Sequence, residues 1–171
     1  MPEGHGLTLV IGGARSGKSR HAETLVGQYA SPHAYIATAQ AFDDEMRARI
    51  DEHRARRSAD WQTIDAPFEL VSALNGVPDR QSVLIDCLTL WLTNVMLAER
   101  DVDEESRQLA DVLAKPRGPW FVVSNEVGLG IVPDNPLGRR FRDAAGRLNQ
   151  MVAERASSVI FMVAGLPMKV K

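Results

Sequence analysis

A short glycine-rich segment constrains the fold of this chain more than any other feature. Residues 12–19 read GGARSGKS and match the phosphate-binding pattern G-x-x-x-x-G-K-[ST]. The apolar run LTLVI at 7–11 precedes the segment, and a helical pattern begins at Lys18. Nucleotide phosphates bind where such a loop joins a buried strand to the N-terminus of a helix. The segment therefore predicts an α/β fold that binds a nucleotide.

The residue types in this loop account for its chemistry. Glycine lets the backbone curl so that successive N–H groups face phosphate oxygens. The Lys18 ammonium group can reach the β- and γ-phosphates, and the Ser19 hydroxyl group can bind Mg²⁺. We predict Lys18 to be catalytic and Ser19 to be a metal ligand. The predicted nucleotide-binding residues of the loop are Gly12, Gly13, Ala14, Arg15, Ser16, Gly17, Lys18 and Ser19.

Strand and helix patterns alternate along the rest of the chain. Apolar segments typical of buried strands lie at 34–38, 82–86, 120–124 and 158–164. Helical patterns lie at 18–29, 43–57, 68–74, 88–98, 103–114 and 137–156. Strands that are apolar throughout and alternate with helices form mostly parallel sheets covered on both faces. We predict a three-layer P-loop NTPase fold of the RecA-like type, as one domain over residues 1–171 with a loose leader at 1–6.

A carboxylate at the end of the strand at 82–86 is a second candidate for metal binding. Asp86 follows the buried run SVLI. A carboxylate in such a place is costly unless it is paired or bound to a metal ion. We predict that Asp86 binds Mg²⁺ together with Ser19 and lies beside the nucleotide. The alternative is that Asp86 is only the N-cap of the next helix.

The helix predicted at 43–57 is densely charged and contains His53. At 3.6 residues per turn, Met46, Ile50, His53 and Arg57 fall on one face of this helix. Nearby arginines favour the neutral imidazole, which is a good nucleophile toward phosphorus, and they can also neutralise a triphosphate. The alternative is a solvated helix with ion pairs and a half-buried histidine.

Charge and cysteine content exclude several classes of protein. The formal net charge is −2, which gives no general attraction to nucleic acid or to an anionic membrane. The single cysteine, Cys87, excludes an intrachain disulfide and a multi-cysteine metal site. No apolar run approaches the ~18 residues that span a bilayer, and the first residues do not resemble a signal peptide. We expect a cytoplasmic protein with no nucleic acid partner and no membrane span.

The motifs together resemble a known enzyme family. The matching segments are GGARSGKSRHAE at 12–23, YIATA at 35–39, DDEMRARIDEHRARR at 43–57, W-x-T at 61–63, DCLTLWLTN at 86–94, SNEVGLGIVP at 124–133, GRRFRDAAGRLNQ at 138–150 and the terminal GLPMKVK. In this order they resemble the bifunctional adenosylcobinamide kinase / adenosylcobinamide-phosphate guanylyltransferase family of cobalamin biosynthesis. The resemblance covers nearly the whole chain from Leu7 onward.

The resemblance implies two reactions and a set of site residues. One reaction phosphorylates adenosylcobinamide with ATP or GTP. The other transfers GMP from GTP to adenosylcobinamide phosphate through a guanylylated histidine, here His53, and releases pyrophosphate. Asp65 takes a position where the family commonly has Glu. The further nucleotide-binding residues implied are Ala37, Thr38, Ala39, Arg54, Ala55, Arg56, Arg57, Asp65 and Asp86. The resemblance also implies a homo-oligomer, as a trimer.

Several alternatives stay open on the residues alone. The chain could be a P-loop kinase for another small metabolite, with His53 structural, or a RecA-like NTP-dependent switch. The loop at 125–133 could touch the corrinoid or a neighbouring subunit, or simply connect two elements. Arg139, Arg140 and Arg142 could hold the substrate phosphate or lie in solvent. The segment 88–97 with Trp91 is expected to be core or a subunit interface, with a corrinoid-binding surface as the alternative.

Overall fold

We describe the protein from a computed structural model, which describes residues 5–55 and 57–171. The side chains of Arg49 and His53 are not described either. The predicted nucleotide-binding residue Arg56 and most of the predicted leader therefore lie outside the described residues. Gly6, which the sequence analysis assigns to the leader, is the first residue of strand β1.

A single mostly parallel sheet forms the centre of the described residues. It contains seven strands in the order β3-β2-β4-β5-β1-β6-β7. The strands are β1 (Gly6–Gly12), β2 (His33–Ala37), β3 (Trp61–Asp65), β4 (Val83–Asp86), β5 (Pro119–Asn125), β6 (Ser158–Val163) and β7 (Leu166–Lys169). β7 pairs antiparallel with β6, and the other pairings are parallel. The C-terminal ends of the parallel strands consequently lie side by side at one end of the sheet.

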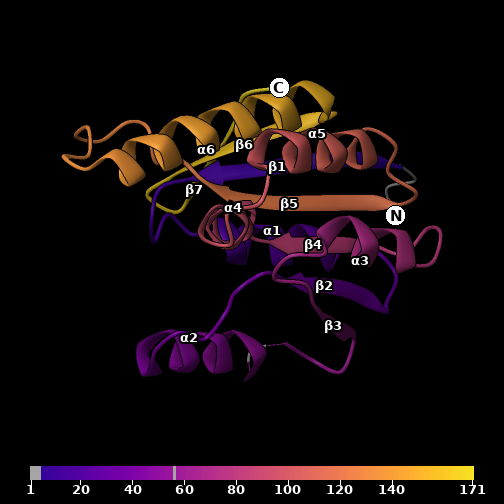
Figure 1. Cartoon of the computed structure of the whole chain (residues 1–171). Helices are drawn as coiled ribbons and strands as arrows, with labels where there is room; N and C mark the ends of the chain where they lie inside the picture. Colours follow the sequence, from indigo (N-terminus) through magenta and orange to yellow (C-terminus); the bar gives the residue numbers. More distant parts are fainter. Residues whose placement is uncertain (1–4, 56) are drawn as a thin grey trace.

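Helices cover both faces of this sheet (Figure 1). They are α1 (Lys18–Val26), α2 (Asp44–Ala55), α3 (Leu70–Gly76), α4 (Leu88–Leu97), α5 (Val102–Leu113) and α6 (Pro136–Arg155). Buried residues of α3 to α6 form one apolar cluster with the sheet. Ala22 and Val26 of α1 belong to a second cluster on the opposite face. Two cores separated by one sheet confirm the predicted three-layer architecture.

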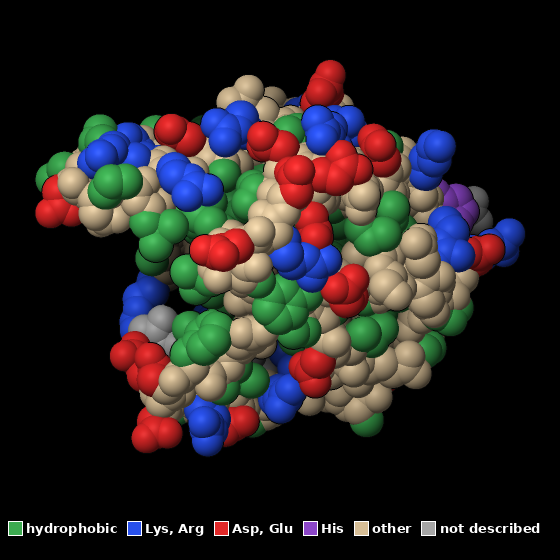
Figure 2. All heavy atoms as spheres, in the orientation of Figure 1, with side chains coloured by type: hydrophobic (Ala, Val, Ile, Leu, Met, Phe, Trp, Pro, Cys, Tyr) green, Lys and Arg blue, Asp and Glu red, His purple; other side chains and the backbone are tan. Residues whose placement is uncertain are grey.

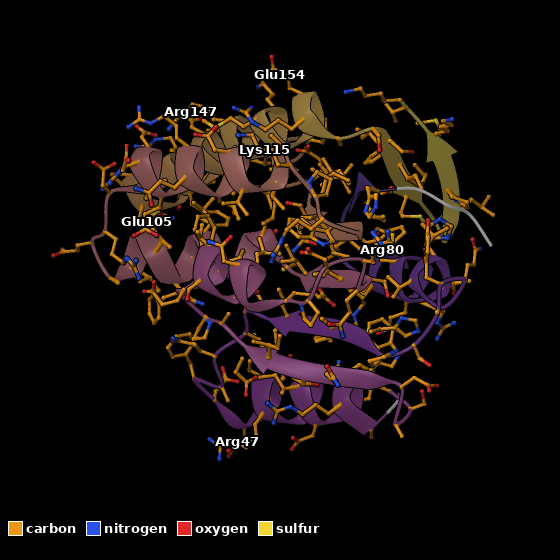
Figure 3. The ribbon with its side chains drawn as sticks, turned by 90° about the vertical axis from the view of Figure 1, so that its right-hand side faces the viewer. Arg47, Arg80, Glu105, Lys115, Arg147 and Glu154 are labelled. Carbon is orange, nitrogen blue, oxygen red and sulfur yellow. The ribbon has the colours of Figure 1, made fainter. Side chains whose placement is uncertain are left out.

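Helix α2 stands apart from these layers. Figure 1 shows it beyond the end of the sheet where the parallel strands finish, joined to the body by two connecting segments. Asp43 caps it, because the Asp43 Oδ1 atom accepts a hydrogen bond of 2.7 Å from the Met46 N–H group. Met46 and Ile50 are half-buried, and Figure 3 shows Arg47 pointing away from the body. Among the described side chains of α2, only Met46 and Ile50 are therefore partly buried on the predicted apolar face.

Two strands were missed by the sequence analysis, and both lie at edges of the sheet. β3 alternates half-buried and exposed residues, whereas the analysis sought strands that are apolar throughout. All four residues of β7 are exposed, and Pro167 lies within the strand. Proline cannot donate to a strand ladder and is tolerated at such an edge. The remaining predicted elements are confirmed, although α1 ends at Val26 rather than at residue 29.

A helix that crosses a membrane must be both long and apolar. Among residues 5–55 and 57–171, no helix combines the length and the apolar composition that such a crossing needs.

Candidate nucleotide-binding site

The glycine-rich loop joins β1 to α1 and has the geometry predicted for phosphate binding. Gly17 has a φ of 90°, a conformation that glycine adopts without strain, and α1 begins at the next residue. A β-carbon on Gly12 would lie 2.6 Å from Ser16 Oγ and 2.9 Å from the Met162 carbonyl oxygen. Only glycine fits at position 12, so the loop can curl closely against the end of β1.

Two polar side chains of this loop are available for phosphate groups. The Ser16 Oγ atom is buried and has no hydrogen-bond partner among the described residues. The Lys18 Nζ atom donates a hydrogen bond of 2.9 Å to the Gly13 carbonyl oxygen, which folds the side chain over the loop. Burial lowers the pKa of Lys18, and the nearby Cys87 and Asp86 oppose this shift. Lys18 and Asp86 are thus electrostatic neighbours.

The turn between β6 and β7 supports the loop from outside. The Gly165 N–H group donates a hydrogen bond of 3.0 Å to the Ser16 carbonyl oxygen. Gly165 has a φ of 81°, and its Cα atom would lie 3.4 Å from a β-carbon on Gly17. The sequence analysis missed this contact. Its only local signal is the glycine of the terminal GLPMKVK segment.

Asp86 is the last residue of β4, which lies between β2 and β5. It is in register with Ala37 of β2 and with Val123 of β5. Its Oδ2 atom accepts a hydrogen bond of 2.9 Å from the Tyr35 hydroxyl group. The N-cap residue of α4 is Cys87, and its side chain makes no capping hydrogen bond. The alternative that Asp86 is merely a helix cap is therefore wrong.

Thr38, directly after β2, is buried and hydrogen-bonded to other protein groups. It is fully buried, and its carbonyl oxygen accepts a hydrogen bond of 2.8 Å from Asn94 Nδ2. The Thr38 N–H group donates to the Asp86 carbonyl oxygen, and the hydroxyl group is bonded to Cys87. Since these polar groups already have protein partners, we interpret Thr38 as a residue that orders the loop. Ala37 and Ala39 on either side of it are half-buried.

Two arginines connect the C-terminal region of α2 to the sheet, Arg54 in the last turn of the helix and Arg57 two residues after its end. Arg54 forms an exposed ion pair with Asp65 at the end of β3, with 3.1 Å between Nη2 and Oδ1. The Arg57 guanidinium group lies over the ring of Tyr35, 3.6 Å from its centroid. Ala55 is the last residue of α2 and is exposed. The backbone of His53 lies on this helix, while its side chain is outside the described residues. Residues 54, 55, 57 and 65 are thus brought together.

The loop after β5 projects from the same end of the molecule. Arg142 donates hydrogen bonds to the Gly128 and Gly130 carbonyl oxygens, and Arg139 donates to Pro133. Arg139 and Arg142 therefore hold this loop, although Arg139 is exposed like Arg140. Figure 2 shows hydrophobic side chains gathered on this projection. Its large exposed hydrophobic residues are Leu129, Ile131, Val132 and Leu137.

Trp91 belongs to the core. Its side chain is 1% exposed, and its indole N–H group donates a hydrogen bond of 2.9 Å to the Phe68 carbonyl oxygen. Helix α4 likewise buries Leu88, Leu92 and Val95. The expectation is core or a subunit interface, and the core is confirmed for these residues, whereas Leu97 at the end of α4 is exposed. A flat corrinoid-binding surface at Trp91 is excluded because the ring is covered.

Comparison with known proteins agrees with this site. The sequence model of the family described as cobinamide kinase / cobinamide phosphate guanyltransferase matches residues 8–170. The chain is 49% identical over 166 residues to the bifunctional adenosylcobalamin biosynthesis protein CobP of Pseudomonas aeruginosa, covering 95% of this chain and 96% of that protein. It is 41% identical over 182 residues to CobU of Salmonella typhimurium, which has the same description, covering 96% and 99% of the two chains.

A solved structure supports the fold independently. A prototypical ATPase of the type III secretion system of pathogenic bacteria aligns with a TM-score of 0.57 at 11% sequence identity. The alignment covers 96% of this chain and 57% of the ATPase chain. At so low an identity the likeness concerns the fold alone. It confirms the predicted RecA-like P-loop NTPase architecture.

Proposed function

Because the chain belongs to the cobinamide kinase / cobinamide phosphate guanyltransferase family, we propose that it phosphorylates adenosylcobinamide with ATP or GTP and then guanylylates the product with GTP. The observation that carries the proposal is the convergence of three elements at one end of the sheet. The loop between β1 and α1, the end of β4 at Asp86 and the end of α2 all lie there. Ligands of parallel sheets bind at this edge.

The kinase step needs positioning and charge stabilisation. The hydroxyl oxygen of adenosylcobinamide attacks the γ-phosphorus, and the bond from this phosphorus to the bridging oxygen breaks, which releases the nucleoside diphosphate. The P-loop N–H groups and Lys18 hold the phosphates and stabilise the charge that moves to the leaving group. Burial disfavours the charged form of Lys18 and lowers its pKa. Anionic phosphates beside the ammonium group would favour the charged form again.

The guanylyl transfer uses two displacements. A ring nitrogen of His53 attacks the α-phosphorus of GTP, and the phosphorus–oxygen bond to pyrophosphate breaks. An oxygen of adenosylcobinamide phosphate then attacks the phosphorus of GMP-His53. The phosphorus–nitrogen bond breaks, which gives adenosylcobinamide-GDP and regenerates the imidazole. Arg54 and Arg57 at the end of α2 supply positive charge beside this reaction.

Ser19 and Asp86 are the proposed ligands for Mg²⁺. Hydroxyl and carboxylate oxygens suit this hard cation, which usually binds through one or two protein ligands and the substrate phosphates. Tyr35 occupies Oδ2 of Asp86, and among the described residues Oδ1 is left for a cation. The bound ion would neutralise charge on the phosphate oxygens. The half-buried state of both side chains is compatible with a nucleotide-carried metal ion.

Further contacts to the nucleotide are assigned to the segment after β2 and to the end of α2. We assign them to Ala37, Ala39, Arg54, Ala55, Arg56, Arg57 and Asp65. Asp65 has a shorter side chain than the Glu that the family commonly has at this position. Its carboxylate forms an ion pair with Arg54, and we propose that it contacts the nucleotide from there. The exposed hydrophobic projection at 129–137 supports a homo-oligomer, which we propose to be a trimer acting in the cytoplasm.

Product analysis tests this proposal. The protein is incubated with adenosylcobinamide, Mg²⁺ and ATP or GTP, and the corrinoids are identified by liquid chromatography and mass spectrometry. We expect adenosylcobinamide phosphate with either nucleotide and adenosylcobinamide-GDP only when GTP is present. A Lys18→Ala variant is the control for contaminating kinases. Unchanged corrinoid in the presence of steady NTP hydrolysis would favour the NTP-dependent switch. Phosphorylation without any guanylylated product would favour a simple kinase.

A further inference from the structure

Tyr35 connects the end of α2 with the carboxylate of Asp86. One face of its ring carries the guanidinium group of Arg57, 3.6 Å from the ring centroid. Its hydroxyl group, at the far end of the ring, donates a hydrogen bond of 2.9 Å to Asp86 Oδ2. Trp61 of β3 packs edge-on against the same ring, with 6.0 Å between centroids. A single side chain therefore contacts residues that the proposed function assigns to two different parts of the site.

The environment of Tyr35 fixes its position and its chemistry. The residue is 4% exposed, and strand β2 holds its backbone between β3 and β4. The Tyr35 hydroxyl group is the donor of the bond to Asp86, because a carboxylate oxygen can only accept. A donor of this kind fixes which oxygen of Asp86 is engaged.

Arg57 has a reason to remain on this ring. A guanidinium group over an aromatic face is attracted by the ring electrons, more strongly where water is excluded. The Arg57 Nη1 atom is buried and has no hydrogen-bond partner among the described residues. The Arg57 Nη2 atom reaches Thr63 Oγ1 at 3.4 Å, so the ring of Tyr35 and one long hydrogen bond hold this cation.

We propose that Tyr35 is a positioning residue that orients Asp86 for the metal ion through its hydroxyl group and seats the end of α2 through its ring. The proposal rests on the proposed function, because it takes Asp86 as a metal ligand and α2 as the carrier of the nucleophile. Outer partners of metal ligands typically contribute 10–100-fold to metal affinity or activity. The two contacts are separable, since phenylalanine keeps the ring and removes only the hydroxyl group.

The first test measures the metal contribution to nucleotide binding. Isothermal titration calorimetry gives the dissociation constant of a non-hydrolysable GTP analogue with Mg²⁺ and with EDTA. For Tyr35→Phe we expect an increase of about tenfold with Mg²⁺ and no change with EDTA. Tyr29 is the only other tyrosine of the chain, and Tyr29→Phe is the matched control, which should change neither value. If Tyr35→Phe leaves the Mg²⁺ value unaltered, the hydroxyl group does not orient a metal ligand.

The same titration separates this inference from the proposed function. Asp86→Asn should also weaken binding with Mg²⁺ and not with EDTA. If Asp86→Asn has no effect, the metal assignment itself is wrong. If Asp86→Asn has the effect and Tyr35→Phe does not, only the role of Tyr35 is wrong.

The second test addresses the ring. Labelling of the protein by α-labelled GTP is followed over time in Tyr35→Phe, Tyr35→Leu and Arg57→Lys. Tyr35→Leu and Arg57→Lys both keep a positive charge at position 57, which the proposed function uses, and remove the stacking of a planar guanidinium group on the ring. Both changes should slow labelling at least about tenfold relative to Tyr35→Phe, because a small displacement of a nucleophile is costly. Arg57 is only half-buried, so Arg57→Lys keeps the test valid if Tyr35→Leu does not fold. Equal labelling rates in Arg57→Lys and Tyr35→Phe would contradict a seating role.

Discussion

The Thr38 hydroxyl group and the backbone of Cys87 are joined by two hydrogen bonds. The Thr38 Oγ1 atom donates to the Cys87 carbonyl oxygen at 2.7 Å and accepts from the Cys87 N–H group at 2.8 Å. Both residues are buried at the C-terminal ends of neighbouring strands, and Asp86 directly precedes Cys87. One hydroxyl group thus fixes the backbone that carries the proposed metal ligand.

Replacing Thr38 by valine should destabilise the protein. The shape of the side chain is kept, but the Cys87 N–H group loses its partner in a buried place. The Cys87 carbonyl oxygen keeps the N–H group of Trp91 as a donor. We expect the free energy of unfolding to fall by about 1–3 kcal/mol, measured by urea denaturation. Thr38→Ser should retain most of the stability, and a stable Thr38→Val protein would show that the bonds contribute little.

Replacing Lys18 by alanine should slow both reactions. The ammonium group neutralises phosphate oxygens where charge increases in the transition state. Loss of such a donor typically lowers the rate about 10²–10³-fold. Initial rates of adenosylcobinamide phosphate and adenosylcobinamide-GDP formation give the result. Near-normal rates in both reactions would contradict the assignment of this loop as the phosphate-binding site.

Replacing Asp86 by asparagine should raise the requirement for Mg²⁺. The two side chains have nearly the same shape, but the amide has no negative charge for the cation. We expect the Mg²⁺ concentration at half-maximal activity to rise at least about tenfold. The measurement is a Mg²⁺ titration at fixed GTP, with circular dichroism as a check on folding. An unchanged titration would remove Asp86 from the metal site.

Acidification should destabilise the protein through His33. This side chain is buried, and its Nδ1 atom lies 2.6 Å from Ser82 Oγ. Burial lowers the pKa of His33 below its ordinary value of 6.5, although Asp60 opposes the shift. The unfolded chain therefore binds a proton more readily, so the stability from His33 is complete above pH 6.5 and is lost as the pH falls toward the folded-state pKa. Denaturation between pH 5 and 7.5 should show a shallower slope for His33→Gln. An identical slope would mean that other groups cause the loss.

The parts of the site that could be predicted from sequence are those with local signals. The glycines, Lys18 and Ser19 are contiguous, and Asp86 directly follows a buried strand, so spacing alone indicates their chemistry. The structure brings Lys18 and Asp86 close enough to interact electrostatically. The layered α/β fold was predictable for a similar reason, because its inner strands are uniformly apolar.

The contacts that were not predicted depend on which strands are neighbours. Tyr35 reaches Asp86 only because β2 lies next to β4, and Gly165 reaches Ser16 only because the β6–β7 turn folds over the loop. Hydrophobic periodicity does not specify strand order. It also missed β3 and β7, since exposed edge strands lack the apolar run that indicates a buried strand.

We expect the protein to carry GMP covalently on His53. The protein is incubated with α-labelled or γ-labelled GTP and Mg²⁺ and then denatured. Label from the α-position should remain on the protein, survive alkali and be lost in acid, as a phosphorus–nitrogen bond requires. Label from the γ-position should not remain, because it leaves with pyrophosphate.

Two histidine variants make this measurement decisive. His53→Ala should abolish the α-label and the guanylyl transfer, while phosphorylation of adenosylcobinamide continues, because γ-transfer needs no covalent histidine. His21 lies on α1 close to the phosphate-binding loop, and His21→Ala is the matched control that should keep the label. Loss of the label in His21→Ala and its retention in His53→Ala would contradict the assignment of the nucleophile. Retention of the label in both variants would contradict covalent catalysis by either histidine.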